Sequence, residues 1–177
     1  MRLFLYILLA FTISSCGNTI YIVRHAEKES GIDPTTMKTI KDPPLSLQGQ
    51  KRALKLKEIL GGKGITHIFS TNTLRTISTA KPLKELTLGL PIEIYSSKAD
   101  STSKFIEKIK AIKKGNILIV GHSNTVDDLC NLITGKTVLP GDLDEKIFDN
   151  LFILKRKGNT YRFKNVKKQS HKKLLTA

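Results

Sequence analysis

The hydrophobic residues of this chain follow two alternating patterns. Short, uninterrupted apolar runs predict buried strands at residues 20–23, 65–70, 92–95 and 117–120. Apolar residues at helical spacing predict helices over 46–60, around 74–80, around 105–112 and over 126–133. A last pair of apolar runs within 151–166 predicts a hairpin that turns at Lys157-Gly158-Asn159. Repeated β-α units with continuous apolar strands predict an α/β fold, a three-layer α/β/α sandwich around a mainly parallel sheet.

The composition agrees with a globular protein of this kind. The chain has 177 residues, of which 40% are hydrophobic and 25% are charged, which excludes a disordered or fibrous protein. This length fits one domain with a sizeable core. Only two residues are cysteine, so a disulfide framework is excluded. We expect Cys130, on an apolar helix stripe, to be a buried thiol.

The N-terminus has the pattern of an export signal. Arg2 precedes an apolar run from Leu3 to Ile13, which is shorter than the roughly 20 residues that span a bilayer. The run ends in Ile13-Ser14-Ser15-Cys16, which resembles a bacterial lipobox. This resemblance implies a lipoprotein signal peptide over residues 1–15, a lipid on Cys16 and one domain over 16–177. It also implies a bacterial cell-envelope protein, lipid-anchored and extracytoplasmic. An ordinary signal with a coincidental cysteine is the alternative.

Polar residues that carry chemistry follow three of the predicted strands. Arg24-His25-Ala26-Glu27 follows the first strand, Ser70 to Arg75 follows the second, and Gly121-His122-Ser123-Asn124 follows the strand near residue 117. Sites in such sheets lie beyond the carboxyl ends of the strands, so we expect these groups to share one crevice. Two arginines and two histidines would make a cationic pocket, and guanidinium groups match the geometry of phosphate oxygens. Phosphate is therefore the expected ligand.

The connections of the predicted fold differ in length. Residues 28–45 contain Gly31, Pro34, Pro43 and Pro44 without a clear period, which predicts a long loop. A long loop directly after a motif is more often functional than not. After residue 45 we expect only short connections and no inserted lid domain.

The same residues resemble the phosphoglycerate-mutase-like group of the histidine phosphatase superfamily. Val23-Arg24-His25-Ala26-Glu27 is similar to its opening motif, and Ala26 is typical of a sub-branch. The segments at 44–50, 70–80 and 120–124 are similar to its later motifs, in the family's order. The resemblance implies a phosphatase with a phosphoglycerate-mutase-like fold and His25 as the nucleophile that forms a phosphohistidine. It further implies that Arg24, Arg75 and His122 hold the phosphoryl oxygens, with Ser123 and Asn124 beside them, and that no metal or cofactor takes part.

The chemistry of the residues agrees with that assignment. An attacking imidazole must be neutral, and we expect two neighbouring guanidinium groups to lower the pKa of His25. The proton donor is less apparent, because Ser123 stands where some relatives have an aspartate after the second histidine. Three acids remain as donor candidates: Glu27, Glu93 and Asp100. The expected substrate is a phosphomonoester, either a small molecule or a phosphoprotein.

Two other readings remain open. His25, His122, Glu27 and Asp127 are possible metal ligands, although nearby arginines repel a metal ion. The chain is alternatively a non-catalytic lipid-anchored protein that binds phosphorylated ligands or anionic surfaces.

The charge of the chain is concentrated near its end. The net charge is +15, and after Asp149 the following cations face no acid: Lys155, Arg156, Lys157, Arg162, Lys164, Lys167, Lys168, Lys172 and Lys173. Attraction to anionic lipid headgroups and a merely solvated basic tail are both consistent with this pattern. Nucleic acid is not the expected partner, because the basic tail has few aromatic residues and an exported protein rarely meets nucleic acid.

Overall fold

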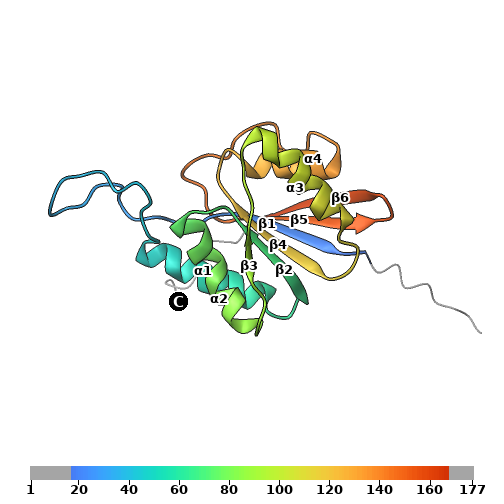
Figure 1. Cartoon of the computed structure of the whole chain (residues 1–177), viewed down its shortest axis with the longest axis horizontal. Helices are drawn as coiled ribbons and strands as arrows, with labels where there is room; N and C mark the ends of the chain where they lie inside the picture. Colours follow the sequence, from blue (N-terminus) through green and yellow to red (C-terminus); the bar gives the residue numbers. More distant parts are fainter. Residues whose placement is uncertain (1–16, 168–177) are drawn as a thin grey trace, which may run out of the picture.

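The computed structural model of the chain describes residues 17–167 and has one sheet with helices on both faces (Figure 1). The strands are β1 (Thr19–Arg24), β2 (Ile65–Ser70), β3 (Ile92–Ile94), β4 (Asn116–Gly121), β5 (Asn150–Lys157) and β6 (Thr160–Lys167). The helices are α1 (Leu47–Leu60), α2 (Leu74–Leu86), α3 (Ala99–Ala111) and α4 (Val126–Thr134). Each of these elements overlaps a segment that the hydrophobic pattern predicts.

The six strands form one sheet in the order β3-β2-β4-β1-β5-β6. The four strands from β3 to β1 run parallel, whereas β5 is antiparallel to both β1 and β6. The sheet is therefore mainly parallel. We call the end at which β1, β2, β3 and β4 begin the amino end of the sheet, and the opposite end its carboxyl end.

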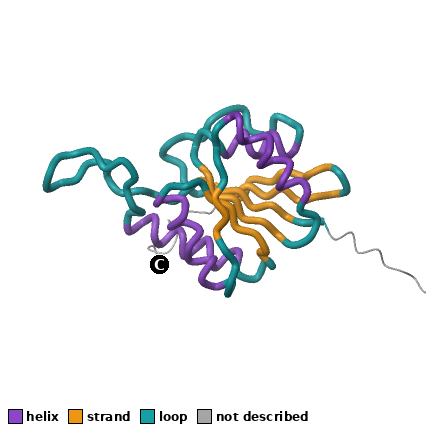
Figure 2. The backbone as a smooth tube through the Cα atoms, viewed as in Figure 1, coloured by secondary structure: helices purple, strands orange, loops and turns teal. Residues whose placement is uncertain are grey.

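Alternating side chains of the sheet enter two separate cores. Ile20 and Ile22 of β1 pack in the core under α3 and α4, whereas Tyr21 and Val23 pack in the core under α1 and α2. The central strand β4 divides its residues between the two cores in the same way. Figure 2 shows the helices on either side of the strands. This arrangement confirms the predicted α/β/α sandwich.

The start of α1 is fixed by contacts with the segment that follows β1. The Ser46 hydroxyl accepts a hydrogen bond from the Gly49 amide at 3.1 Å and caps the helix. A Cβ atom on Gly49 would lie 2.0 Å from the carbonyl oxygen of Glu27. Glycine thus permits the helix to touch the backbone two residues after His25.

Two long loops reach the carboxyl end of the sheet. Residues 28–45 form a loop with two isolated bridges that extends away from the body of the molecule (Figure 1), as predicted. Residues 135–149 connect α4 to β5, so the expectation of only short connections after residue 45 was wrong. Because β5 is antiparallel to β1, the chain must travel from the end of α4 back to the carboxyl end before β5 begins. Hydrophobic periodicity does not carry that information.

Several predictions lie outside the part of the chain that the structure describes. These are the signal peptide, Cys16 and the last three lysines, Lys168, Lys172 and Lys173. Within residues 17–167, no helix has the length and apolar character needed to cross a membrane. Cys130 is fully buried, as predicted, and burial raises the pKa of its thiol to about 12.

Candidate active site

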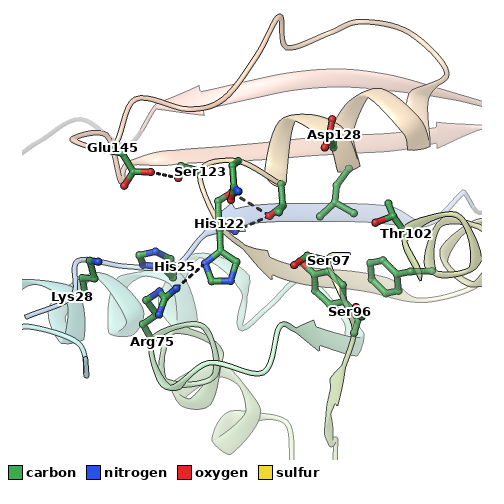
Figure 3. Close-up of a pocket in the computed structure, with 15 residues that line it drawn as sticks. His25, Lys28, Arg75, Ser96, Ser97, Thr102, His122, Ser123, Asp128 and Glu145 are labelled. Atoms are coloured by element: carbon green, nitrogen blue, oxygen red, sulfur yellow. Dashed lines mark hydrogen bonds between the residues drawn. The ribbon is translucent and has the colours of Figure 1, made fainter. Parts of the chain in front are cut away.

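One cavity of about 550 Å³ opens at the carboxyl end of the sheet. His25 follows β1, Arg75 lies in the first turn of α2, and His122 follows β4, and all three line this cavity (Figure 3). The rings of the two histidines meet edge to face, with their centroids 5.4 Å apart. Residues about 50 positions apart in the chain are thus brought together where the parallel strands end.

His25 is held by backbone contacts on both sides. Its own amide donates to the Gly121 carbonyl at 2.9 Å, and the next amide, of Ala26, donates to the Thr79 hydroxyl at 2.9 Å. Its Nδ1 lies 2.8 Å from the carbonyl oxygen of Ala26. Because a carbonyl only accepts, Nδ1 carries the proton and Nε2 keeps its lone pair.

The same ring is neutral at ordinary pH. His25 is buried, and this burial, more than any charge, lowers its pKa to about 4. The positive charge of Arg24 adds to the effect, followed by His122 and Arg75. The sequence predicts two guanidinium groups as the cause of the lowered pKa, but loss of hydration is the larger cause.

His122 is held through both ring nitrogens. Its Nε2 lies 2.8 Å from the buried hydroxyl of Thr71, and its Nδ1 lies 3.5 Å from Nη2 of Arg75. A guanidinium only donates, so Nδ1 accepts and Nε2–H donates to Thr71. Burial is the main cause that lowers the pKa of His122 to about 4, with Arg75 and Arg24 as further causes.

Arg75 is tied to the long loop after the first motif. Its Nη1 donates to Asp42 Oδ1 at 3.1 Å, and the other oxygen of Asp42 accepts from the Leu74 amide at the start of α2. The loop therefore supplies an acid that orients the guanidinium. Sequence analysis did not single out Asp42, because an isolated aspartate in a loop carries no distinctive pattern.

Arg24 does not line the cavity, in contrast to expectation. Its buried guanidinium donates to the carbonyl oxygens of Asp144 and Ile147, and Nη2 lies 2.5 Å from Glu145 Oε2. Its flat face stacks 4.1 Å from the centre of the Phe148 ring. The 135–149 loop thus surrounds the guanidinium, and Arg24 reaches the cavity only through Glu145.

Glu145 is the acid that sequence analysis missed. It lines the cavity together with Ser123 and Asn124, and it accepts a hydrogen bond from the Ser123 hydroxyl. Its side chain is 72% exposed. The hydrogen bond from Ser123, followed by the charge of Arg24, holds the pKa of Glu145 below its ordinary value. Nothing in the local sequence marks residue 145, since only the fold of the loop brings it here.

None of the three donor candidates from the sequence lines the cavity. Glu27 forms a bidentate ion pair with Arg52 of α1, at distances between 2.5 and 2.9 Å. Glu93 binds Lys108 of α3, and Asp100 accepts from Ser101. Glu27 lies two residues after His25, but its side chain is directed to α1 and holds the first motif against that helix.

The structure does not match the alternative hypothesis of a metal site. Between residues 17 and 167, no three His, Cys, Asp or Glu side chains gather as a metal site would require. Glu27 is engaged by Arg52, and Asp127 is buried on α4 and does not line the cavity. Arg75 instead contacts His122, and the positive charges of Arg24 and Arg75 lower the pKa of both histidines.

The outer part of the cavity is polar and was not anticipated from the sequence. Lys28 lies on one side, and Ser96, Ser97, Thr102 and Asp128 contribute hydroxyl or carboxyl groups (Figure 3). The rings of Tyr95 and Phe105, which also line the cavity, stack at 4.2 Å between centroids. Arg75 and the two histidines are therefore suited to an anion, and the rest of the lining offers hydrogen-bonding groups.

Comparison with known proteins agrees with this geometry. The model of the histidine phosphatase superfamily (branch 1) matches residues 20–100, which include β1, the first motif and Arg75. A search of curated protein sequences finds no match. Over residues 20–100 the chain is therefore similar to the histidine phosphatase superfamily (branch 1).

Solved structures share the fold at low sequence identity. One is described as an alpha-ribazole-5'-P phosphatase from Escherichia coli K-12, with 14% identity, a TM-score of 0.65, and coverage of 86% of this chain and 97% of that chain. A second is described as a phosphohistidine phosphatase from Agrobacterium tumefaciens, with 15% identity, a TM-score of 0.61 and coverage of 84% and 97%. A mycobacterial glucosyl-3-phosphoglycerate phosphatase has 15% identity, a TM-score of 0.61 and coverage of 85% and 98%.

Proposed function

We propose that this protein is a phosphatase that hydrolyses phosphomonoesters through a phosphohistidine on His25. The observation that carries the proposal is the state of that ring. It is buried, neutral and fixed through Nδ1, so Nε2 presents a lone pair inside a cationic cavity. A neutral, oriented imidazole is the requirement for nucleophilic attack on phosphorus.

Arg75 and His122 hold the phosphoryl group in this scheme. Both face the cavity beside His25, and charge stabilisation of the phosphoryl oxygens is the main contribution in phosphoryl transfer. The dianion raises the pKa of His122, because an opposite charge favours the protonated ring. His122 then donates from both nitrogens, one to Thr71 and one to the phosphoryl group.

Glu145 donates a proton to the leaving group in this scheme. A phosphoryl dianion competes for Arg24 and for the Ser123 hydroxyl, the two partners that keep Glu145 ionised. Without them, and beside an anion, the pKa of Glu145 rises and the carboxyl takes a proton. As Nε2 of His25 bonds to phosphorus, the ester P–O bond breaks and the leaving oxygen receives that proton.

The second half of the cycle regenerates the enzyme. A water molecule gives a proton to the Glu145 carboxylate and attacks phosphorus as the P–Nε2 bond breaks. The electron pair returns to His25, and inorganic phosphate leaves. One ester and one water thus become one alcohol and one phosphate, with the ring and the carboxyl restored.

The substrate in this proposal is a small, hydrophilic phosphate ester. The cavity of about 550 Å³ exceeds the space that a phosphoryl group needs, and its outer wall carries Ser96, Ser97 and Thr102. Such groups complement the hydroxyls of a polar leaving group. A phosphorylated protein side chain is the alternative substrate, as sequence analysis also left open.

We propose in addition that the mature protein begins at a lipid-modified Cys16 in the bacterial cell envelope. The support is the apolar run that ends in Ile13-Ser14-Ser15-Cys16. Mass spectrometry of the membrane fraction tests it. A mature N-terminus that is unmodified or located elsewhere would contradict it.

The activity is tested with the chain from Gly17 onward on a panel of phosphate esters, with and without a chelator. Wild type is expected to release phosphate equally in both conditions, and His25→Ala is expected to release none. His67→Ala, at a histidine outside the cavity, is the matched control and keeps full turnover. Binding of phosphate esters without any release would instead support a non-catalytic binding protein. Loss of activity with the chelator would favour the metal reading.

A further inference from the structure

The carboxyl end of the sheet carries acids together with cations such as Lys28, Lys146 and Lys167, whereas the amino end is mainly basic. Acids gather around the carboxyl end: Glu27, Asp42, Asp100, Asp127, Asp128, Asp144 and Glu145 all lie after parallel strands, at the starts of helices or in the loops there. Cations gather at the amino end. We define the amino-end surface as Lys63, Lys110, Lys113, Lys114, Lys136, Lys155, Arg156 and Lys157.

Hydrogen bonds join the segments of this surface. Nη1 of Arg156 donates to the carbonyl oxygens of Lys110 and Ile112, at 3.1 Å each. Lys110 Nζ donates to the Leu132 carbonyl at 2.9 Å, which brings the end of α3 to the last turn of α4. The side chain of Asn116 donates to the carbonyl of Lys63. The cations therefore belong to one continuous surface, although they come from four separate segments.

The same segments contain no acid. No Asp or Glu occurs within residues 59–84, 108–126, 129–141 or 150–177. Of the acids in the helices that end here, Glu58 pairs with Lys55, and Glu85 lies 3.9 Å from Lys81. Glu107 lies one turn before the end of α3. Lys63, Lys113, Lys114, Lys136, Lys155 and Lys157 are exposed, so their charges face solvent.

The chain enters the fold at this surface. The Arg156 amide donates to the Asn18 carbonyl at 3.0 Å, and a Cβ atom on Gly17 would lie 2.4 Å from the Arg156 carbonyl oxygen. In Figure 1 the start of β1 and the turn between β5 and β6 lie at the same end of the sheet. The residue before Gly17 is Cys16, the predicted site of the lipid. A lipid there would place the amino-end surface next to the bilayer.

We propose that the amino-end surface docks on an anionic lipid bilayer and directs the catalytic cavity away from the membrane. Basic residues near an anionic surface attract it additively, and a polybasic patch strengthens a lipid anchor. The carboxyl end, which holds the cavity, mixes acids with cations such as Lys28 and Arg75, so it is attracted less strongly than the amino-end surface. The enzyme thus stands with its active site open to water-soluble substrates.

The test measures vesicle binding without the lipid anchor. The strands, helices and cores that the structure describes are formed by residues 17–167, so the chain from Gly17 to Ala177 retains them. Its cosedimentation is compared on vesicles of phosphatidylcholine alone and of phosphatidylcholine with phosphatidylglycerol. The test variant is Lys113→Glu with Lys114→Glu and Lys157→Glu. The matched control, Lys51→Glu with Lys55→Glu and Lys81→Glu, changes three exposed lysines of α1 and α2 by the same net charge.

Wild type is expected to bind only the anionic vesicles, and added salt is expected to release it. The amino-end variant is expected to lose about tenfold or more in partitioning, and the control less than about threefold. Both variants keep wild-type phosphatase turnover, which separates this proposal from the catalytic one. Equal loss in the two variants, or equal binding to neutral vesicles, would overturn it. So would a wild type that ignores vesicles but binds a DNA duplex.

Discussion

The Nε2 atom of His122 lies 2.8 Å from the hydroxyl oxygen of Thr71, which is itself buried. The Thr71 hydroxyl donates to Thr76 at 3.1 Å, so it accepts from the histidine. This direction agrees with Arg75, which donates toward Nδ1 from the other side. A chain of hydroxyl groups at the start of α2 therefore sets which nitrogen of His122 carries the proton.

Thr71 is expected to act as a positioning residue for His122. Thr71→Val removes the acceptor of Nε2–H, and losing a buried hydrogen bond of this kind costs about 1–3 kcal/mol, or roughly 5- to 150-fold in kcat/KM. Thr71→Ser keeps the hydroxyl and should restore most of the activity. The acid limb of the pH profile should change in the valine variant only. An identical pH profile in both variants would reduce Thr71 to a packing role.

Glu145 is expected to have two opposing effects on catalysis. It holds Arg24 before substrate binds, and in the proposed cycle it protonates the leaving group. Glu145→Gln should lower KM, because a competing carboxylate is removed, and should also lower kcat. The loss in kcat should be larger for alkyl phosphates than for p-nitrophenyl phosphate, whose leaving group needs little protonation. Glu107→Gln, on an exposed part of α3, is the control and should match wild type. A uniform loss across leaving groups would exclude Glu145 as the donor.

The free energy of unfolding is expected to decrease as the pH is lowered, over a range set by the pKa values of His25 and His122. In the fold their pKa values are about 4, whereas in the unfolded chain they take protons near 6.5. The unfolded chain therefore binds more protons between these values, and the free energy of unfolding decreases as pH falls from about 6.5 toward about 4. The difference amounts to about 3 kcal/mol per histidine at most.

Urea denaturation at pH 7 and pH 5 measures this dependence. His122→Asn should remove part of the slope. A free energy of unfolding that is constant over this interval would show that the histidines are not buried in neutral form. His25 should stay neutral well below pH 6.5, so kcat/KM should not fall through protonation of the nucleophile in the upper part of this range.

Gly49→Ala is expected to destabilise the protein, although alanine is usually preferred to glycine inside a helix. Alanine gains about 1 kcal/mol over glycine inside a helix. At position 49, however, its Cβ would meet the Glu27 carbonyl oxygen at 2.0 Å, so α1 or the first motif must move. We expect a net loss of about 1–3 kcal/mol in the free energy of unfolding and a fall in turnover. Gly62→Ala, which meets no atom within 4 Å, should have little effect. Equal stabilities for the two variants would contradict the contact.

The sequence was sufficient to predict the fold and the inner part of the site. Strands such as residues 65–70 are predicted from their short apolar runs. Because sites in such sheets lie at the carboxyl ends of the strands, the sequence also predicts that His25, Arg75 and His122 share one cavity, as they do. These predictions depend on local pattern and on the topology of parallel sheets. Both are encoded in short stretches of sequence.

The parts that sequence analysis missed depend on how loops return to the site. Glu145 and Asp42 lie in loops without periodicity, and only tertiary contacts place them on Arg24 and Arg75. Glu27 was expected in the site because of its position beside His25. Its side chain is directed to Arg52 instead, since the chain turns toward α1 after the first motif.

The most direct test of the account is to trap the covalent intermediate and locate it. Wild type is mixed with a phosphorus-labelled ester, quenched in base, and digested with trypsin, which cleaves after Arg24 and Lys28. The account predicts label on the peptide of residues 25–28, stable in base and lost in acid, and none in His25→Ala. Label on the peptide that contains His122, or full turnover by His25→Ala, would contradict it.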